Sequence, residues 1–280
     1  MRRKAVFLDI DGTLLGRGRR IAATDLKAME EAAAKGHFIF LNTGRSLGNI
    51  PPFMLEIPFL KGIVAGGGAH VLLAGKRGGS SGGSSGFRTI YRKWFSARLL
   101  SMVFAWYKNK PRSCVLEGER NCYIINKTTW SFPDKAPEYV KSYADFKRKS
   151  SGDHITKLTL DSLAREDERL FFGAICTVNC FPEYTELLIK GENKAKAMQI
   201  VLDKLGMERE DSVAIGDSIN DLEMIKFAGT GIAMGNACAE LKAAASAITA
   251  ACGKGGVAKA IRKYVIKISN EELGMRDSKK

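Results

Sequence analysis

The feature that most constrains the fold of this chain of 280 residues is a repeated pattern of short apolar runs that end in polar turns. The first run, residues 5–8, stops at Asp9, and the second, residues 37–41, leads to Thr43. Unbroken apolar runs of this length indicate parallel strands that are buried on both faces. A helical segment separates the two runs, as the strand–helix–strand unit of a parallel sheet requires.

The helix expected between these two strands has recognisable ends. Thr24 is placed to cap its first turn and Gly36 to end it. Leu26, Met29 and Ala33 recur at helical spacing, so we expect them to form the face that packs on the sheet.

The alternation of strand and helix continues to about residue 92, is interrupted, and then returns. A third strand is expected at 61–65, followed by two hairpin arms at 71–73 and 89–91. After the interruption, Asn193 caps a helix that Gly206 ends, and the expected strands are 212–215, 231–234 and 247–249, with helices near 237–245 and 257–266. The outer segments therefore predict one discontinuous core.

The interrupting segment, residues 93–187, has a different pattern. Short alternating strands are expected at 113–117, 122–126, 155–160, 174–178 and 183–189, with helices near 97–108, 137–148 and 163–172. The predicted fold class is α/β: a doubly wound, Rossmann-like parallel-sheet core, residues 1–92 and 188–280, with an inserted α+β cap domain, residues 93–187.

Residues 78–86, between the two hairpin arms, consist only of glycine and serine. Such a segment buries no apolar surface and behaves as a flexible coil. It resembles a constructed linker, and it contributes nothing to the prediction of the fold.

Composition excludes several classes of protein. The chain has no apolar run near the ~18 residues that a membrane span needs, and the acids at 9 and 11 interrupt the only segment that resembles the start of a signal peptide. The six cysteines form no Cys-x-x-Cys pair, which favours reduced thiols and a cytoplasmic protein.

The net charge is +14, but no interleaved aromatic residues accompany the basic clusters, so nucleic acid is not the expected partner.

Two acidic motifs follow predicted strands. The first is Asp9-Ile10-Asp11-Gly12-Thr13, and the second, Gly216-Asp217-Ser218-Ile219-Asn220-Asp221, fixes the pattern Gly-Asp-x-x-Asn-Asp. The first pattern occurs by chance on the order of 0.003 times in a chain of this length. In doubly wound sheets the ligand crevice lies beyond the carboxyl ends of the strands, where we expect Asp9, Thr43 and Asp217 to meet.

Together these motifs resemble the haloacid dehalogenase (HAD) superfamily, and their order resembles its Cof-like phosphatases, which carry a large cap between the second and third motifs. The resemblance extends over nearly the whole chain. It includes the late segments Gly231-Ile232-Ala233-Met234-Gly235-Asn236-Ala237 and Gly256-Val257-Ala258.

The resemblance implies a role for each acid of the first motif. Asp9 would be the nucleophile that forms an aspartyl phosphate, which divides hydrolysis into two easier displacements. Asp11 would be the general acid and base, which protonates the leaving oxygen and then deprotonates water.

The resemblance also implies a Mg²⁺ site. A hard cation is needed because carboxylates repel a phosphate dianion, and the expected ligands are Asp9, the carbonyl of Asp11, Asp217 and waters held by Asp221, with Asn220 as a further candidate. For phosphate binding, the resemblance implies the hydroxyl and backbone N–H of Thr43, the close approach allowed by Gly44, and the cationic clamp Lys194 at a helix N-terminus.

Three positions depart from the family pattern. Gly67 stands where asparagine is frequent, Ala195 follows the lysine in place of glycine, and Gly255 stands where an aspartate commonly precedes the Gly-Val pair. The first departure puts a substrate contact from that position in question.

The sequence therefore predicts a Mg²⁺-dependent phosphatase that hydrolyses a small phosphorylated metabolite, such as a sugar phosphate. Two alternatives stay open: a phosphomannomutase-like transfer of the phosphoryl group to another hydroxyl, and a non-catalytic protein that binds nucleic acid through its basic core. No pattern in the sequence indicates an oligomeric state.

Overall fold

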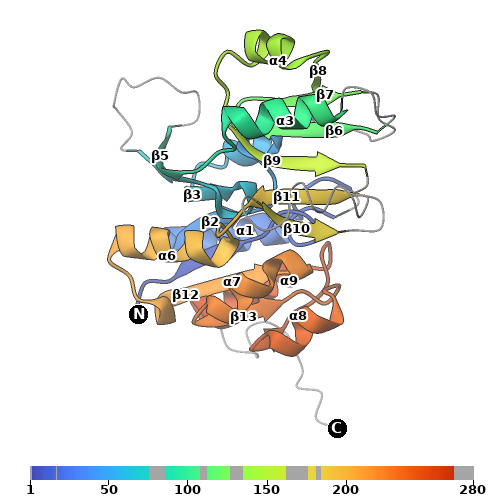
Figure 1. Cartoon of the computed structure of the whole chain (residues 1–280). Coiled ribbons are helices and arrows are strands. Elements are labelled where there is room, and N and C mark those ends of the chain that lie inside the picture. Colours follow the sequence, from blue (N-terminus) through green and yellow to red (C-terminus); the bar gives the residue numbers. More distant parts are fainter. Residues whose placement is uncertain are drawn as a thin grey trace.

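The computed structural model describes residues 2–16, 18–75, 86–107, 112–126, 135–161 and 184–267, together with the backbone of residues 176–180. Within these residues the strands form one sheet of eight and one sheet of six. Figure 1 shows helices α3 and α4 with the green strands at the top of the molecule and the orange and red elements of the larger sheet's layers at the bottom. Of the glycine-serine segment 78–86, only Gly86 belongs to the described residues.

The eight-stranded sheet is the doubly wound core that the sequence predicts. Its order is β14-β13-β12-β1-β2-β3-β4-β5, with neighbours parallel from β14 to β3 and antiparallel from β3 to β5. The strands are β1 Ala5–Leu8, β2 Phe38–Asn42, β3 Leu60–Ala65, β4 His70–Ala74, β5 Phe87–Arg92, β12 Ser212–Gly216, β13 Thr230–Ala233 and β14 Ala247–Ile248.

Helices cover both faces of this sheet. One layer contains α1 Ala23–Ala34, α2 Pro52–Leu55, α9 Gly256–Ala260 and the π-helical turn η5 Ile261–Ile266, and the other contains α6 Lys194–Leu205, α7 Leu222–Phe227 and α8 Ala239–Ala244. Alternate residues of β1 face the two layers: Val6 and Leu8 pack with the first, and Ala5 and Phe7 with the second. Burial on both faces explains why the strand reads as an unbroken apolar run.

The six-stranded sheet forms the cap, inserted between β5 and α6. Its order is β10-β11-β9-β6-β7-β8, and every pair is antiparallel except β7 with β8. Its elements are α3 Ala97–Tyr107, β6 Cys114–Gly118, β7 Cys122–Ile125, β8 Glu138–Tyr139, α4 Tyr143–Ser150, β9 Ile155–Leu160, β10 Cys176–Cys180 and β11 Thr185–Ile189. One face packs with α3 and α4 around Leu116, Tyr123, Leu158 and Leu187, which leaves the other face to the core.

Two predictions about helices are wrong in detail. Helix α1 begins at Ala23 with Ala22 as N-cap, so Thr24 does not cap it, and its buried face includes Ala28 and Met29 while Leu26 is exposed. The helix expected at 137–148 is the short strand β8 followed by α4, which Ser142 caps by accepting a hydrogen bond from the Asp145 N–H. The helix expected at 163–172 lies outside the described residues.

Asp25 explains how the chain accommodates Gly255. Gly255 is the N-cap of α9 in the left-handed conformation, with φ of +69°, and it has no side chain with which to cap the helix. The buried carboxylate of Asp25 in α1 does so instead, because its Oδ1 accepts a hydrogen bond from the Ala258 N–H at 2.7 Å. A capping group from another helix thus replaces the local one.

No helix among the described residues is long and apolar enough to span a bilayer.

We predict that Asp25→Ala lowers the free energy of unfolding by about 1 to 3 kcal/mol, because it leaves the buried Ala258 N–H without an acceptor. Asp25→Asn keeps an oxygen at the same place and should lose less. Urea unfolding of the three proteins measures the difference. Equal stability of wild type and Asp25→Ala would show that α9 does not depend on this cap.

Candidate active site

The carboxyl ends of three neighbouring parallel strands form the site. Asp9 directly follows β1, Thr43 follows β2 and Asp217 follows β12. The Asp9 N–H still donates to the Ile215 carbonyl at 3.0 Å, so the nucleophile candidate is held by the sheet itself. The sequence expectation that these residues arrive at one edge agrees with the observed register of β12, β1 and β2.

Lys194 is the first residue of α6, and its ammonium group lies between two buried carboxylates. Its Nζ is 2.6 Å from Asp9 Oδ1 and 2.5 Å from Asp221 Oδ1. All three side chains are at most 7% exposed. Asn193 fixes the start of this helix by accepting a hydrogen bond from the Lys196 N–H at 2.7 Å.

Asp221 anchors the turn that carries the second motif. Its Oδ2 accepts hydrogen bonds from the backbone N–H groups of Asp217 at 2.9 Å and Ser218 at 3.0 Å. A Cβ atom at Gly216 would lie 2.6 Å from a carboxylate oxygen of Asp221, so only glycine leaves room for this packing. The turn η4, Ile219–Asp221, is therefore fixed by the acid at its end.

Asp217 is held from two sides. The Thr13 hydroxyl donates to its Oδ1 at 3.1 Å, and the Asn236 amide donates to its Oδ2 at 3.3 Å. The same amide donates to the Gly12 carbonyl at 2.9 Å, which joins the two acidic motifs. Gly12 has φ of +80°, and a Cβ there would collide with the Asp217 carboxylate.

Burial and like charges raise the pKa of the acids at this site. Burial, with the nearby Asp221 carboxylate, holds the pKa of Asp9 well above its usual range, although Lys194 opposes the shift. Burial and Asp221 also raise the pKa of Asp217 to about 6. The pKa of Lys194 is raised because the two carboxylates outweigh its burial. Two acids that share one lysine leave negative charge uncompensated.

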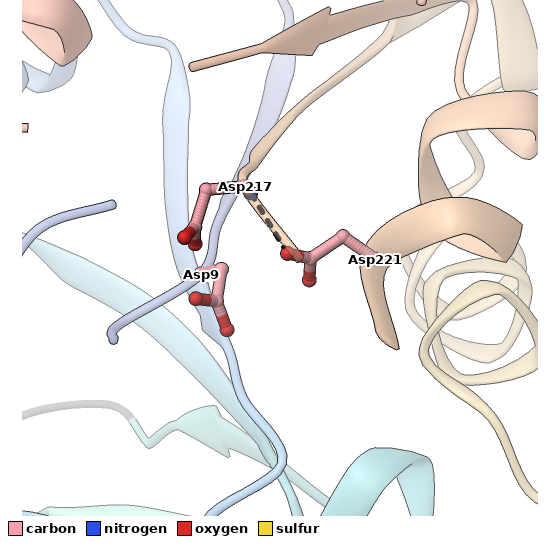
Figure 2. A group of neighbouring side chains, drawn as sticks. All are labelled: Asp9, Asp217 and Asp221. Atoms are coloured by element: carbon pink, nitrogen blue, oxygen red, sulfur yellow. Dashed lines mark hydrogen bonds between the residues drawn. The ribbon is translucent and has the colours of Figure 1, made fainter. Parts of the chain in front are cut away.

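The donor set fits a divalent cation. Asp9, Asp217 and Asp221 each offer one carboxylate oxygen, and these oxygens lie within 4.8 Å of one another (Figure 2). Figure 2 shows the carboxylates of Asp9 and Asp217 side by side, with Asp221 turned toward the backbone of Asp217. An all-oxygen, negatively charged group of this kind suits a hard ion such as Mg²⁺.

Asp11 lies apart from these three carboxylates. Its side chain is 56% exposed, and both of its oxygens accept hydrogen bonds from the Arg45 guanidinium, at 2.7 and 2.8 Å. Its expected contact with a cation, through the backbone carbonyl, does not depend on the direction of the side chain.

The backbone of Thr43 corrects one expectation. Its N–H donates to the Val64 carbonyl at 2.9 Å as part of the sheet, so it is not available to a phosphoryl group. The hydroxyl accepts a hydrogen bond from the Arg45 N–H at 3.1 Å. A Cβ at Gly44 would meet no atom within 4 Å, so the space above it is open. Asn220 is half-buried in η4 and has no side-chain hydrogen bond to the described part of the chain.

Gly67, the first departure from the family pattern, is explained by the cap. A Cβ at this position would lie 3.0 Å from a methyl carbon of Leu188 in β11. The cap side chain therefore occupies the space that a larger residue at 67 would need. Ala195 is a half-buried residue in the first turn of α6.

Sequence reasoning missed four residues of the site: Thr13, Arg45, Ser218 and Asn236. All four stand inside or beside segments that carry the family resemblance, so these segments were recognised but the four residues were given no role. Asn236 stands in the late glycine-rich segment. Only the fold brings it to Gly12, which is 224 positions away in sequence.

The family model for haloacid dehalogenase-like hydrolases matches residues 6–261. The chain belongs to this family. Over 265 residues this HAD-like hydrolase is 30% identical to the 5-amino-6-(5-phospho-D-ribitylamino)uracil phosphatase YcsE of Bacillus subtilis strain 168, which covers 94% of this chain and 96% of the relative.

Solved structures agree with this assignment. A sugar phosphatase of HAD subclass IIB is 25% identical, with a TM-score of 0.76 over 95% of this chain and 100% of that one. A haloacid dehalogenase-like hydrolase from Bacteroides thetaiotaomicron, at 24% identity, shares the fold with a TM-score of 0.78 over 94% of this chain and 99% of its own. This HAD-like hydrolase is a phosphatase, an enzyme that hydrolyses phosphoric monoesters.

We predict that Lys194→Met, studied with a metal chelator present, lowers the free energy of unfolding by about 3 to 5 kcal/mol at neutral pH, because it leaves two buried carboxylates without their cation. The loss should shrink as the pH falls. The pKa of Asp9 is already raised in the folded protein, so protonation favours the folded state, and more strongly without the lysine.

The control is Lys196→Met, two residues further along the same helix, where the lysine is 44% exposed and pairs with Glu192. Urea unfolding at about pH 8 and about pH 5 measures both variants. A loss for Lys194→Met that is the same at both pH values would contradict the charge explanation.

Proposed function

We propose that this HAD-like hydrolase is a Mg²⁺-dependent phosphatase that hydrolyses a small phosphorylated metabolite, such as a sugar phosphate, through an aspartyl phosphate on Asp9. The observation that carries the proposal is the buried Lys194 bridge between Asp9 and Asp221, with Asp217 beside it. The arrangement fixes a nucleophilic oxygen at the centre of a site that has positive charge on one side and cation ligands on the other.

Asp9, Asp217 and the carbonyl of Asp11 would hold the cation, and Asp221 would fix the turn and hold bound water. When bound, Mg²⁺ neutralises the phosphate dianion and the carboxylates around it. Lys194 opposes the rise in the pKa of Asp9 and adds a second positive charge on the side of α6, where the helix N-terminus also favours an anion.

The reaction has two displacements. In the first, an oxygen of Asp9 attacks phosphorus, the bond from phosphorus to the leaving oxygen breaks, and Asp11 gives that oxygen a proton. In the second, water attacks phosphorus, Asp11 takes the proton of the water, and the bond to Asp9 breaks to release phosphate. The Thr43 hydroxyl and the open space above Gly44 support binding of the phosphoryl oxygens, and Asn220 would be a further contact.

The substrate class rests on the relatives together with the cap. The B. subtilis relative is named as a 5-amino-6-(5-phospho-D-ribitylamino)uracil phosphatase, and the subclass IIB structure is a sugar phosphatase. In this chain the cap sheet contacts the core directly, at Gly67 through Leu188 and at Asn49 through Glu117. A small phosphorylated compound enclosed between the two would react away from bulk water.

We predict that Asp9→Asn abolishes Mg²⁺-dependent release of phosphate from 4-nitrophenyl phosphate, because the amide is not a nucleophile. Asp203→Asn, which changes an exposed aspartate of α6, should retain wild-type turnover. Circular dichroism checks that both variants are folded. Unchanged turnover in Asp9→Asn would exclude the aspartyl-phosphate mechanism.

We also predict that Asn236→Ala weakens Mg²⁺ binding by roughly 10-fold, since the amide holds both Asp217 and the Gly12 loop. Isothermal titration with Mg²⁺ measures the dissociation constant without reference to activity. Gln199→Ala, which removes an exposed amide of α6, is the matched control. Equal Mg²⁺ affinity in Asn236→Ala would remove this residue from the metal site.

A panel of phosphorylated sugars, sugar alcohols, nucleotides and cofactors, assayed on the wild type, identifies the preferred substrate. The same panel separates hydrolysis from phosphomannomutase-like transfer. Turnover that requires a sugar bisphosphate would favour transfer, whereas release of phosphate from a monophosphate favours hydrolysis.

A further inference from the structure

Arg45 uses its guanidinium to join the first motif to the loop that follows β2. Nε and one Nη donate to the two oxygens of Asp11 at 2.7 and 2.8 Å, and the other Nη donates to the Asn49 carbonyl at 2.9 Å. The Arg45 side chain is 14% exposed, while that of Asp11 is 56% exposed. The exposed carboxylate of Asp11 is therefore held by the largely buried guanidinium of Arg45.

The backbone of Arg45 is also fixed. Its N–H donates to the Thr43 hydroxyl at 3.1 Å, and its carbonyl accepts from the Gly66 N–H at 2.7 Å. The position of the guanidinium is therefore set by the ends of β2 and β3 and by the turn η1, Leu47–Asn49.

The turn η1 is attached in turn to the cap. The Asn49 amide donates to Glu117 Oε2 in β6 at 3.1 Å. The other oxygen of Glu117 accepts from the Thr159 hydroxyl at 2.6 Å and lies 3.0 Å from the Lys157 ammonium, which also pairs with Glu186 at 2.7 Å. Glu117, Lys157 and Glu186 are all buried, so this network is a rigid part of the cap.

The charge of Glu117 is secured by its neighbours. Burial alone would raise its pKa, but the Lys157 ammonium and the hydrogen bonds from Thr159 and Asn49 outweigh burial and lower the pKa. Glu117 therefore offers Asn49 a carboxylate, and the hydrogen bond between cap and core is a charged one.

A second contact joins the turn η1 to the cap, at Gly48. The position that a Cβ would take at Gly48 lies 2.7 Å from the Asn121 nitrogen, in the turn between β6 and β7, and 2.9 Å from the carbonyl oxygen of Gly118, the last residue of β6. The cap backbone thus lies directly on η1. Any movement of the cap away from the core separates these atoms and releases Asn49.

We propose that Arg45 is a positioning residue for Asp11, and that the contact of Asn49 with Glu117 makes this positioning depend on the seating of the cap. The proposal rests on the acid and base role proposed above for Asp11. It adds a chain of contacts, Asp11 to Arg45 to η1 to Glu117, through which the cap acts on the residue that transfers the proton.

The physical reason lies in the geometry of the guanidinium. Two parallel N–H donors fix the plane of a carboxylate, which a lysine ammonium, a point charge on a flexible chain, does not do. The paired form of Asp11 is the carboxylate, so Asp11 gives up one guanidinium bond when it takes up the proton that it later donates to the leaving oxygen. The other bond still limits the direction of the side chain. When the cap is seated, η1 holds Arg45 and Arg45 holds Asp11; when it is not, Asp11 loses its fixed direction.

Phenyl phosphate and 4-nitrophenyl phosphate test the proposal, because they differ mainly in the need for a proton on the leaving oxygen. Phenolate, whose conjugate acid has a pKa near that of tyrosine at about 10, needs the proton far more than 4-nitrophenolate does. The measured quantity is kcat/KM, which reports the steps up to cleavage of the bond to the leaving oxygen and excludes the later hydrolysis of the aspartyl phosphate.

We expect Arg45→Lys to lower kcat/KM for phenyl phosphate by roughly 100-fold and that for 4-nitrophenyl phosphate by less than roughly 10-fold. Asn49→Ala keeps the carbonyl that binds Arg45 and removes only the link to Glu117. It should change the ratio of the kcat/KM values for the two substrates in the same direction as Arg45→Lys, and by less. Asp11→Asn gives the reference ratio, and the double variant Asp11→Asn with Arg45→Lys should shift it no further.

The matched control is Arg262→Lys, which alters an arginine paired with Glu31 at 3.3 Å outside the site. It should leave kcat/KM unchanged for both substrates. Thermal unfolding of each variant checks that the fold is retained.

The outcomes separate the two proposals. If Asp11→Asn changes the ratio of the two kcat/KM values but Arg45→Lys lowers kcat/KM equally for both substrates, Arg45 acts on phosphoryl binding or on the fold. The positioning role is then overturned. If Asn49→Ala leaves the ratio at the wild-type value, the dependence on the cap is overturned. If Asp11→Asn itself leaves the ratio unchanged, or if wild type hydrolyses neither substrate, the fault lies in the proposed function.

Discussion

The interaction on which the rest of the site depends is the ammonium group of Lys194 between the carboxylates of Asp9 and Asp221. Charges are buried at a high cost unless they are paired, and here one cation serves two anions inside a closed core. The three residues come from the end of the first strand, from the helix that follows the cap, and from the turn after β12. The bridge therefore ties together both halves of a domain that the cap divides in sequence.

This charge balance also explains why the strand ends are so tightly packed. Gly12 and Gly216 stand where any side chain would strike the carboxylate of Asp217 or Asp221. Thr13 and Asn236 each donate a hydrogen bond to one oxygen of Asp217, which fixes the plane of its carboxylate. The acids are fixed before any ligand arrives, which is the condition under which electrostatic stabilisation costs no reorganisation.

The cap meets this rigid centre through few residues. Leu188 occupies the space beside Gly67, and Glu117 binds Asn49 beside the turn that holds Arg45. At Gly67, where this chain departs from the family pattern, the side chain of Leu188 in β11 thus fills the space beside the glycine. Gly255 is matched in the same way by Asp25, whose carboxylate caps α9 from α1.

The parts of the fold that the sequence predicted correctly are those with strong local signals. The apolar runs of β1 and β2 and the Asn193 cap with the Gly206 end of α6 agree with the structure. Predictions based on weaker local signals went wrong: Thr24 does not cap α1, and residues 137–148 divide into a strand and a helix. In both places tertiary packing outweighed local preference.

By itself, the sequence determined the doubly wound core with its inserted cap and located the two acidic motifs after strands, because hydrophobic period and short motifs are local properties of the chain. Only the tertiary structure decided which atoms those acids face. It placed the Thr43 N–H in the sheet rather than in the site, set Arg45 against Asp11, and brought Asn236 to Gly12. Contacts between residues so far apart in sequence follow from the packing of whole elements, which no local pattern encodes.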